Sequence, residues 1–463
     1  MRRAGLLSIV RNPAQLVVVA FVALIAFGMF LLVLPWSTDA ASGLGWEDSL
    51  FLSTSATTVT GLSTVDIDTL SLFGELVVLA LIQVGGFGIM TIGSVLALVT
   101  LRRVGLRQRM LAQAEIGAVD IGELSRLLWA IARITVIVEG TLAVILFVGF
   151  WQGGYEDGPV DAAYSGVFHA IATFNNAGIS LYSDNLAGFV DDPFVILPVT
   201  FGFIIGGLGF PVYVELIRRW RIDRVERRGL AQKGAERVKP WSLHARITIG
   251  ATVVLLVAGP LMVLAFEWTN PDTLGSLGLV DKLTNGWFQG VTPRTAGFNT
   301  IDIGAMNETT LLATSVLMFV GAGPASTSGG IKVTTAAVLA AVIWSEVRGE
   351  RDVNIFRRRL PTPMVRQALT IVLLSLVFVG VTCLVLMAND GLSVTNALFE
   401  STSAFGTVGL STGVTGSIST LGHVVLVIVM ISGRVGPVTF VTAIALRDSA
   451  RLYRHPEERP IIG

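Results

Sequence analysis

Four short segments of the chain place mostly small or hydroxyl residues in front of a glycine, and their backbone oxygens are candidate ligands for a cation. They read "TVTG", "NNAG", "RTAG" and "GTVG", and an aromatic residue stands ten positions before each glycine. The glycines are 117, 119 and 112 residues apart and are Gly61, Gly178, Gly297 and Gly409. Glycine accepts positive φ, so such a segment can direct successive carbonyls to one side. Rings of carbonyls replace the hydration shell of an ion in potassium filters.

The composition indicates a membrane protein. Of the 463 residues, 52% are hydrophobic and 14% are charged, whereas soluble domains have about 25% charged residues. Apolar runs of eighteen or more residues recur along the chain, which is typical of several membrane-spanning helices. The net charge of zero suggests no nucleic-acid partner. A single cysteine and four scattered histidines exclude a disulfide framework and argue against a metal centre.

Each glycine motif has the same place in a repeat of about 116 residues. A first apolar span covers residues 15–35, 127–150, 246–266 and 365–387. A stretch too short to cross the bilayer leads to the motif, and a second span covers residues 73–101, 194–217, 309–345 and 418–446. A segment that enters and leaves on one face must be buried in protein. We expect a short helix there, from Asp48 to Thr57 in the first repeat, whose negative end favours a cation.

These patterns predict an all-α polytopic membrane protein with four membrane–pore loop–membrane repeats around one central pore. It would have eight spans and four re-entrant pore helices. The predicted repeats are residues 12–126, 127–242, 243–363 and 364–463, the last with the C-terminal tail. Lysine and arginine gather in segments 2–11, 102–133, 218–246, 348–366 and 447–459, while the loops between them are acidic. By the positive-inside rule, both termini are expected to be cytoplasmic.

The motif residues are the candidate ion-binding residues. Alternatively, their glycines only allow helices to pack closely, but four motifs in step favour binding. Carbonyl ligands turn side chains away from the axis, so we expect Arg294 to brace the outer mouth. The candidates are Thr58, Val59, Thr60, Gly61, Asn175, Asn176, Ala177, Gly178, Arg294, Thr295, Ala296, Gly297, Gly406, Thr407, Val408 and Gly409.

The second span of the third repeat is interrupted by "GAGPASTSGGIK". Broken backbone is tolerated at this depth only if it is buried in protein or lines a cavity. We expect a gating loop over residues 321–330, below the third motif; a static kink is the alternative. The candidate gate residues are Gly321, Gly323, Pro324, Ser326, Thr327, Ser328, Gly329, Gly330, Lys332 and Arg434.

Arg434 is an arginine in the middle of the last span, and intramembrane charge is a functional hypothesis by default. It could repel cations or tether the loop by hydrogen bonds. The alternative is a structural role, in which it pairs with carbonyls at helix ends. Lys332 is expected to cap the loop or to reach a carbonyl.

The chain resembles the superfamily of potassium transporters with four membrane–pore–membrane repeats, which includes the Trk, Ktr and plant HKT types. The most specific pieces are "TTVTGL", "FNNAGI", "TPRTAGFNT", "SAFGTVGLS", "GAGPASTSGGIK" and "SGRVGPVTF". No extra pair of spans precedes the first repeat, so the chain is more similar to the Ktr-type membrane subunit than to the longer Trk type. Ala325 and Ser328 depart from the glycines typical of the interrupted helix.

The resemblance implies potassium uptake across the bacterial inner (plasma) membrane, driven by the membrane potential, with potassium bound at the filter carbonyls. It also implies a homodimer in membrane lipid, a cytosolic nucleotide-binding RCK-type ring as partner, and no organic cofactor. Symport with sodium stays open. So does a sodium-conducting transporter of the same fold, although such relatives typically carry serine in place of the first filter glycine. We expect no enzyme, because the sequence has neither a nucleotide-binding G-x-x-x-x-G-K-[ST] motif nor a cluster of intramembrane acids.

Overall fold

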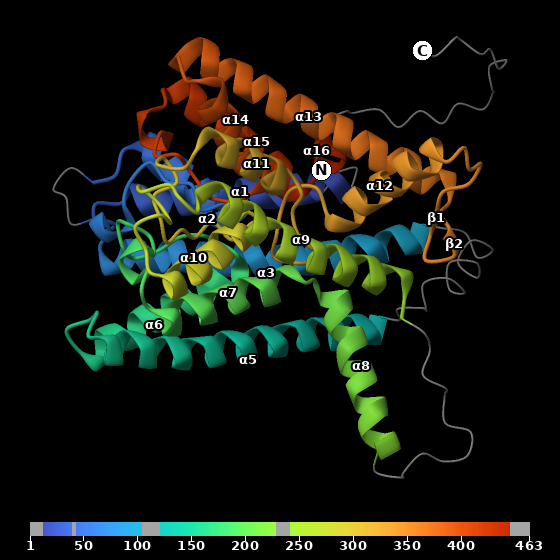
Figure 1. The fold of residues 1–463 in the computed structure, drawn as a ribbon, viewed down its shortest axis with the longest axis horizontal. Helices are drawn as coiled ribbons and strands as arrows, with labels where there is room; N and C mark the ends of the chain where they lie inside the picture. The colour runs from blue at the N-terminus through green and yellow to red at the C-terminus, as the bar shows by residue number, and fades with distance from the viewer. Residues whose placement is uncertain (1–12, 39–42, 104–120, 228–240, 445–463) are drawn as a thin grey trace, which may run out of the picture.

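The computed structural model describes residues 13–38, 43–103, 121–227 and 241–444, and it is mostly helical over these ranges (Figure 1). This confirms the predicted all-α class. In the described ranges, the strands form a single hairpin of β1 (Asn354–Ile355) and β2 (Arg358–Arg359). Both termini, for which the charge pattern predicts a cytoplasmic location, lie outside the described residues.

Four helical triplets follow one another along the described chain. They are α1 (Pro13–Val33), α2 (Trp46–Thr58) and α3 (Leu72–Arg103); α5 (Ile121–Gly153), α6 (Pro159–Asn175) and α7 (Pro193–Gly207); α9 (Leu243–Glu267), α10 (Leu279–Val291) and α11 (Glu308–Phe319); and α13 (Thr362–Asp390), α14 (Val394–Gly406) and α15 (Thr420–Val435). In every triplet the first helix contacts both of the others. Three further helices are α8 (Phe210–Arg227), α12 (Val333–Val347) and α16 (Pro437–Ile444), and short 3-10 turns cover Ile67–Thr69, Ala187–Phe189 and Thr415–Ser417.

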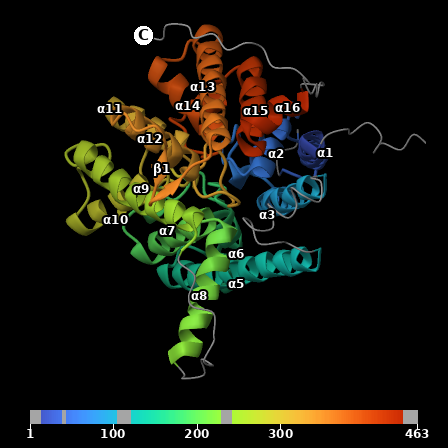
Figure 2. The ribbon, with the colours of Figure 1, turned by 90° about the vertical axis from the view of Figure 1, so that its right-hand side faces the viewer.

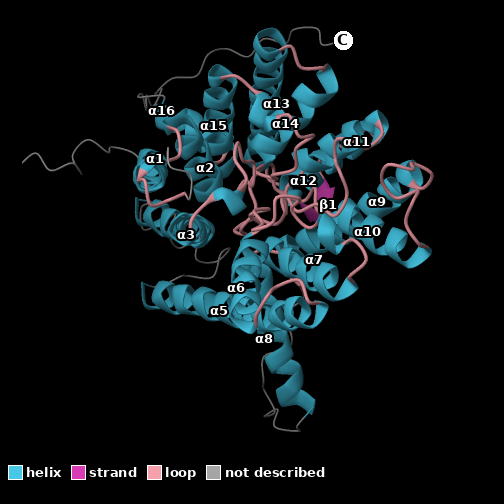
Figure 3. Cartoon of the chain, turned by 90° about the vertical axis from the view of Figure 1, so that its left-hand side faces the viewer, coloured by secondary structure: helices cyan, strands magenta, loops and turns pink. Residues whose placement is uncertain are grey.

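The triplets stand in a ring, in the order of the chain. Helix α3 contacts α6, α7 contacts α10, and α11 contacts α14. The ring closes where α15 and α16 contact α2 and α1, so the two ends of the described chain lie side by side. Figure 3, a view along the long helices, shows loops gathered at the centre of this ring.

The first helix of each triplet is long and apolar enough to cross a membrane. These stretches are Gln15–Val33, Leu128–Gly153, Leu243–Glu267 and Thr362–Asp390, close to the predicted first spans. Large apolar side chains on α1 lie exposed, with Phe27 at 58% and Phe30 at 64%. A helix that is apolar on all sides is typical of a membrane span.

The second spans are more broken than the sequence suggested. We expected single spans over residues 194–217 and 418–446, but α7 and α8 meet at 97°, and α15 and α16 are separated at Gly436. Gly209 and Gly436 both have positive φ, which ends a helix readily. Figure 2 shows α8 leading away from the bundle. Helices α11 and α12 are separated at the predicted interruption. The total of eight spans stays a prediction.

The second helix of each triplet ends just before a glycine motif. Helix α2, Trp46–Thr58, contains the helix expected from Asp48 to Thr57. The aromatics Phe51, Phe168 and Phe399 are buried as core residues. In the third triplet Trp287 is only half-buried, and the neighbouring Phe288 is buried. The reason is a shifted register, because α10 ends six residues before its motif glycine and the other three helices end three residues before theirs.

Glycines at the contact between α9 and α10 generate a stability prediction. A β-carbon on Gly259 would overlap the carbonyl of Gly290, whereas one on Gly250 of the same helix would meet open space. We expect Gly259→Ala to lower the melting temperature of the purified protein, because overpacking costs about 1–3 kcal/mol. Gly250→Ala should leave it unchanged or raise it, since alanine is the better helix former. Equal melting temperatures would contradict this contact.

Candidate functional site

The four glycine motifs share one unusual backbone conformation. Each has positive φ at its glycine and also two residues earlier, at the pairs Val59 and Gly61, Asn176 and Gly178, Thr295 and Gly297, and Thr407 and Gly409. Positive φ is uncommon outside glycine and strained for a β-branched residue, so the surrounding structure must impose it. When left-handed residues alternate with ordinary ones, successive carbonyls turn to the same side. Such a backbone is suited to presenting a row of neutral carbonyl oxygens, which are the ligands in a potassium filter.

The four motif glycines meet around one point. A β-carbon built on Gly178 would lie 2.7 Å from Cα of Gly297, and one on Gly409 would lie 2.9 Å from Cα of Gly61. A β-carbon on Gly297 would lie 3.2 Å from Cα of Gly409, and one on Gly61 would touch the carbonyl of Ala177. Because real β-carbons essentially never approach closer than 3.0 Å, a larger residue would force the backbone to move. The structure thus brings all four motifs together.

Fourteen of the sixteen predicted motif residues are buried, and Gly61 and Gly409 are half-buried. These two glycines line a cavity of about 540 Å³ on the side of the loops that follow the motifs. Asp66, Asp184 and Asp302 line the same cavity, one from each of the first three repeats. The three carboxylates therefore place negative charge next to the motifs, which favours cations over anions.

Helices α2, α6 and α14 end in the same way next to the motifs. In α2 the amide of Val59 donates to the carbonyl of Ala56 (3.1 Å) and that of Thr60 to Ser55 (2.8 Å). The equivalent pairs recur at Asn176 and Ala177, and at Thr407 and Val408. This is the Schellman arrangement around a left-handed residue. The helices thus end at the meeting point, and the negative end of each helix dipole lies there.

Two serines that the sequence analysis missed hold motif glycines in place. The amide of Gly61 donates to the hydroxyl of Ser55 (3.0 Å), and the amide of Gly409 donates to that of Ser403 (3.1 Å). Both serines stand six residues before their glycine, in "STSATTVTG" and "STSAFGTVG". Ala172 and Val291 occupy this place in the other repeats. The repeated serine was the available signal, but a spacing of six matches no helix or strand period.

The predicted gating loop lies between α11 and α12, beside the motifs. The amide of Gly321 donates to Ile331 within the loop (2.8 Å), and that of Gly330 donates to Gly433 of α15 (3.2 Å). A β-carbon on Gly329 would overlap the side chain of Thr407 in the fourth motif. Apart from Pro324 and Ala325, the loop is therefore buried beside the motifs, and the amides of Gly321 and Gly330 find partners inside the protein, as membrane depth requires.

Contacts to the second repeat hold the other part of the loop. The amide of Gly323 donates to the carbonyl of Gly207 (2.9 Å), and that of Phe210 donates to Ala325 (3.1 Å). These partners stand at the break between α7 and α8. The side-chain amide of Asn176, in the second motif, and the hydroxyl of Thr327 are hydrogen-bonded (3.1 Å). These hydrogen bonds therefore hold the loop against the break between α7 and α8.

Two cationic side chains, the buried Arg434 and the half-buried Lys332, bind carbonyl groups around the loop. The guanidinium of Arg434 donates to the carbonyl of Thr327 and, at 3.4 Å, to that of Gly85 on α3. Lys332 donates to the carbonyl of Ser328, so it reaches a carbonyl as expected. No acid forms an ion pair with either cation in the described part of the chain. Of the roles considered for Arg434, these contacts correspond to a tether.

Arg294 does not brace the outer mouth, so that expectation is wrong. Its side chain is buried and reaches the hydroxyl of Thr252 on α9 at 3.4 Å. Thr252 lies within the membrane-spanning part of α9, away from the outer end at Glu267. The cause is the turn over residues 292–296, which follows α10 and redirects the side chain.

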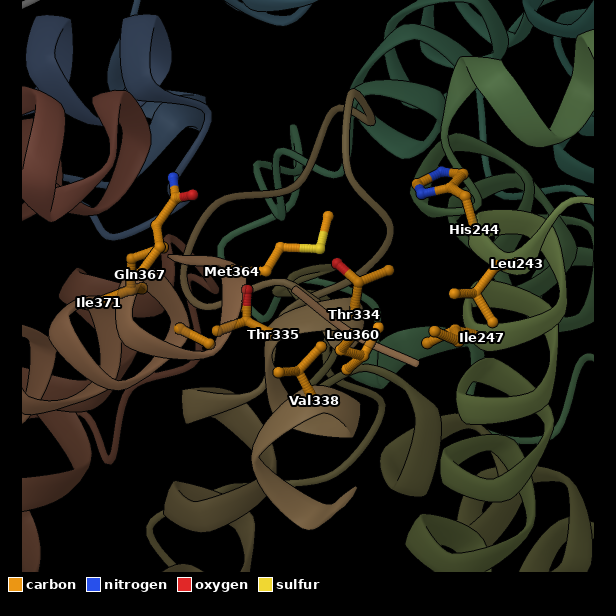
Figure 4. A pocket seen from close by; sticks show the side chains of 11 residues that line it. Leu243, His244, Ile247, Thr334, Thr335, Val338, Leu360, Met364, Gln367 and Ile371 are labelled. Carbon is orange, nitrogen blue, oxygen red and sulfur yellow. The ribbon is translucent and has the colours of Figure 1, made fainter. Parts of the chain in front are cut away.

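A second cavity, of about 350 Å³, lies beside the start of α12 (Figure 4). Thr334 and Thr335, which follow Lys332 closely, line it together with His244 of α9 and Met364 of α13. The C-terminal end of the loop is therefore next to open space.

Comparisons with known proteins agree on one family. The family described as TrkH, a cation transport protein, matches residues 7–454. The chain is 38% identical to the Ktr system potassium uptake protein B of Bacillus subtilis, over 98% of this chain and 97% of the relative. It is 30% identical to the potassium/sodium uptake protein NtpJ of Enterococcus hirae, over 98% and 97%. The fold is similar to the potassium transporter TrkH from Vibrio parahaemolyticus, with a TM-score of 0.71 and 20% identity over 96% of this chain and 87% of that chain.

The contacts of Arg434 predict how firmly the loop is held. In Arg434→Ala the carbonyl of Thr327 loses a charged donor, which contributes about 1.5–3 kcal/mol. We expect the loop amides, such as those of Gly321 and Gly330, to exchange hydrogen at least tenfold faster by mass spectrometry. The control is Arg348→Ala, whose guanidinium only stacks on Trp344 (4.5 Å). Unchanged exchange in Arg434→Ala would show that the arginine does not hold the loop.

Proposed function

This chain belongs to the TrkH family of cation transport proteins, and from this premise we propose that it conducts potassium ions into the cell. The family consists of transporters, which agrees with the expectation that the chain is not an enzyme. It is a multi-pass membrane protein. The observation that carries the proposal is the meeting of four glycine motifs with the same left-handed backbone at one point.

We propose that the motif carbonyls form a potassium filter. An ion that enters must exchange its water for protein oxygens, and a ring of carbonyls from four segments provides them without a charged side chain. The ends of α2, α6 and α14 add the negative ends of their dipoles. The cavity next to the motifs is lined by Asp66, Asp184 and Asp302. Their negative charge raises the local concentration of cations, which also supports a cation as the transported ion.

The loop over residues 321–330 is the proposed gate. It is mostly buried beside the motifs and is rich in glycine, so few side chains limit its movement. Its hydrogen bonds to Gly207, Gly433 and Arg434 hold it in the path in the described conformation. In this proposal the loop obstructs the ion path until these hydrogen bonds break and others replace them. The cavity next to Thr334 provides the space into which the loop moves.

The membrane potential is sufficient as the energy source. An inside-negative potential contributes about 2.3 kcal/mol per charge per 100 mV, which sustains a gradient of about fiftyfold. We propose that the chain is the ion-translocating subunit in a bacterial inner membrane, with both termini in the cytoplasm. The relative from Bacillus subtilis is named as part of a Ktr system, which supports a system of several components. We propose that the further components are a second copy of this chain and a cytosolic RCK-type ring.

Sodium is the second candidate ion. The relative from Enterococcus hirae carries both potassium and sodium in its name, so sodium conduction or symport is a specific alternative. Position 61 is glycine, whereas sodium-conducting transporters of this fold typically carry serine there, and this supports potassium.

Uptake of rubidium tests the proposed function. Cells that lack their own potassium uptake systems should accumulate rubidium when they express the chain, and excess sodium should compete weakly. We expect Gly61→Ser to lower the preference for rubidium over sodium at least tenfold, because the added atoms displace motif carbonyls. Gly380→Ser on α13 is the control, since a β-carbon there meets open space and the residue does not line the cavity next to the motifs. Uptake of sodium alone by the wild type would favour the alternative.

Removal of the loop tests the proposed gate. A chain without residues 323–330 should conduct rubidium faster than the wild type, because the buried obstruction is gone. Flux into proteoliposomes under a fixed potassium diffusion potential measures this without the cytosolic partner. The purified variant must elute with the wild type in gel filtration, which controls for folding. A folded variant with unchanged or lower flux would contradict the gate.

A further inference from the structure

A buried carboxylate on α5 has no role in the ion path described so far. Glu139 is 9% exposed and lies in the middle of the apolar stretch Leu128–Gly153, where it is the only acid. A charged residue in the middle of a membrane span is costly and marks a candidate functional residue. In the described ranges no lysine or arginine forms an ion pair with it. The reason for an acid at this position must therefore lie in its hydrogen-bond partners.

Two side-chain amides from different helices converge on this carboxylate. Asn175 at the end of α6 donates to Oε1 of Glu139 (3.1 Å), and Gln83 of α3 donates to Oε2 (3.3 Å). Asn175 also donates to the side-chain oxygen of Gln83 (2.8 Å). The three side chains thus close a ring of hydrogen bonds between α3, α5 and α6, inside the membrane.

The chemistry of this ring explains why an acid is present. Two NH₂ groups donate to this side chain, and a carboxylate accepts from both without turning a donor toward either. The amide of Asn175 also donates to the carbonyl of Ile171 (3.0 Å). A glutamine at position 139 would turn its own NH₂ group toward one of the two donors, and one hydrogen bond would be lost.

Asn175 connects this ring to the ion path. It is the last residue of α6, and Asn176, the next residue, has the left-handed conformation of the second motif and bonds to Thr327 of the loop. A β-carbon on Gly86 of α3 would overlap the amide oxygen of Asn175, so this side chain has little freedom. The position of Asn175 therefore determines where the second motif begins.

We propose that Glu139 is a positioning residue that holds Asn175 and so sets the cation affinity and selectivity of the second motif. This inference rests on the proposed function. It differs from a purely structural role, because a structural acid would affect the amount of folded protein without changing the ion preference of the protein that folds.

Three variants test the inference by rubidium uptake at varied rubidium and sodium concentrations. Glu139→Gln should raise the KM for rubidium about tenfold, since a hydrogen bond to a charged group is worth about 1.5 kcal/mol. Asn175→Asp should do the same, because it brings two carboxylates together. In the double variant E139Q/N175D the new amide can donate to the new carboxylate. The amide of Gln83 can turn so that it donates to Asp at position 175 and accepts from Gln at position 139, so KM and sodium competition should return to within threefold of the wild type.

The matched control is Glu267→Gln on α9. Glu267 is a buried acid that accepts hydrogen bonds from Thr273 (2.7 Å), Asn270 (2.7 Å) and the amide of Asn307 (3.0 Å), all in outer loops. This variant should change the amount of protein in the membrane but not the KM or the sodium competition. Immunoblots of membrane fractions normalise all uptake rates.

Every outcome of these experiments either supports or overturns the role inferred for Glu139. If Glu139→Gln lowers only the protein amount or the maximal rate, or if the double variant stays as impaired as the single ones, the inference is overturned. If the wild type takes up rubidium and the variants at position 139 behave like it, only the inference fails. If the wild type neither takes up rubidium nor gains thermal stability from it after purification, the proposed function fails and the inference falls with it.

Discussion

Every polar backbone group at the membrane centre must find a partner inside the protein, and the architecture follows from this constraint. The four motifs and the loop are the least regular segments of the chain, yet they lie at the centre of the helix ring. The described contacts provide their partners, such as Gly433 for Gly330 and Gly207 for Gly323. A single repeat could not enclose such segments, because each motif borders glycines or carbonyls of other repeats.

The four motifs share one backbone conformation, but different side chains support it in each repeat. Ser55 and Ser403 bind the motif amides in the first and fourth repeats. The second repeat relies on Asn175 and its carboxylate partner, and in the third the hydroxyl of Thr292 donates to the carbonyl of Phe298 (2.6 Å). The pair of left-handed residues is therefore common to all four repeats, while the side chains that support it differ. This is expected if the ion interacts with the backbone alone and each repeat meets different neighbours.

The sequence predicted those features that depend on spacing and on membrane depth. The positions of Gly61, Gly178, Gly297 and Gly409 predicted the four motifs, and "GAGPASTSGGIK" predicted the break between α11 and α12. The sequence did not predict the 97° bend after Gly207, because the cluster "GGLGF" is equally compatible with close helix packing. The direction of Arg294 depends on a turn that no periodicity reveals. The serine contacts cross a helix end, so no repeat pattern indicates them.

The closing contact of the ring has a consequence for biosynthesis. Gly61 and Gly409 border each other although they come from opposite ends of the described chain. Arg434 and Gly433, which bind the loop, follow Gly409 in the sequence. A ribosome-bound chain that has inserted only three repeats therefore has neither a closed ring of carbonyls nor a firmly held loop. The same last segment completes the meeting of the four motifs and the contacts that hold the loop, so in the proposed pore an unfinished chain would lack both.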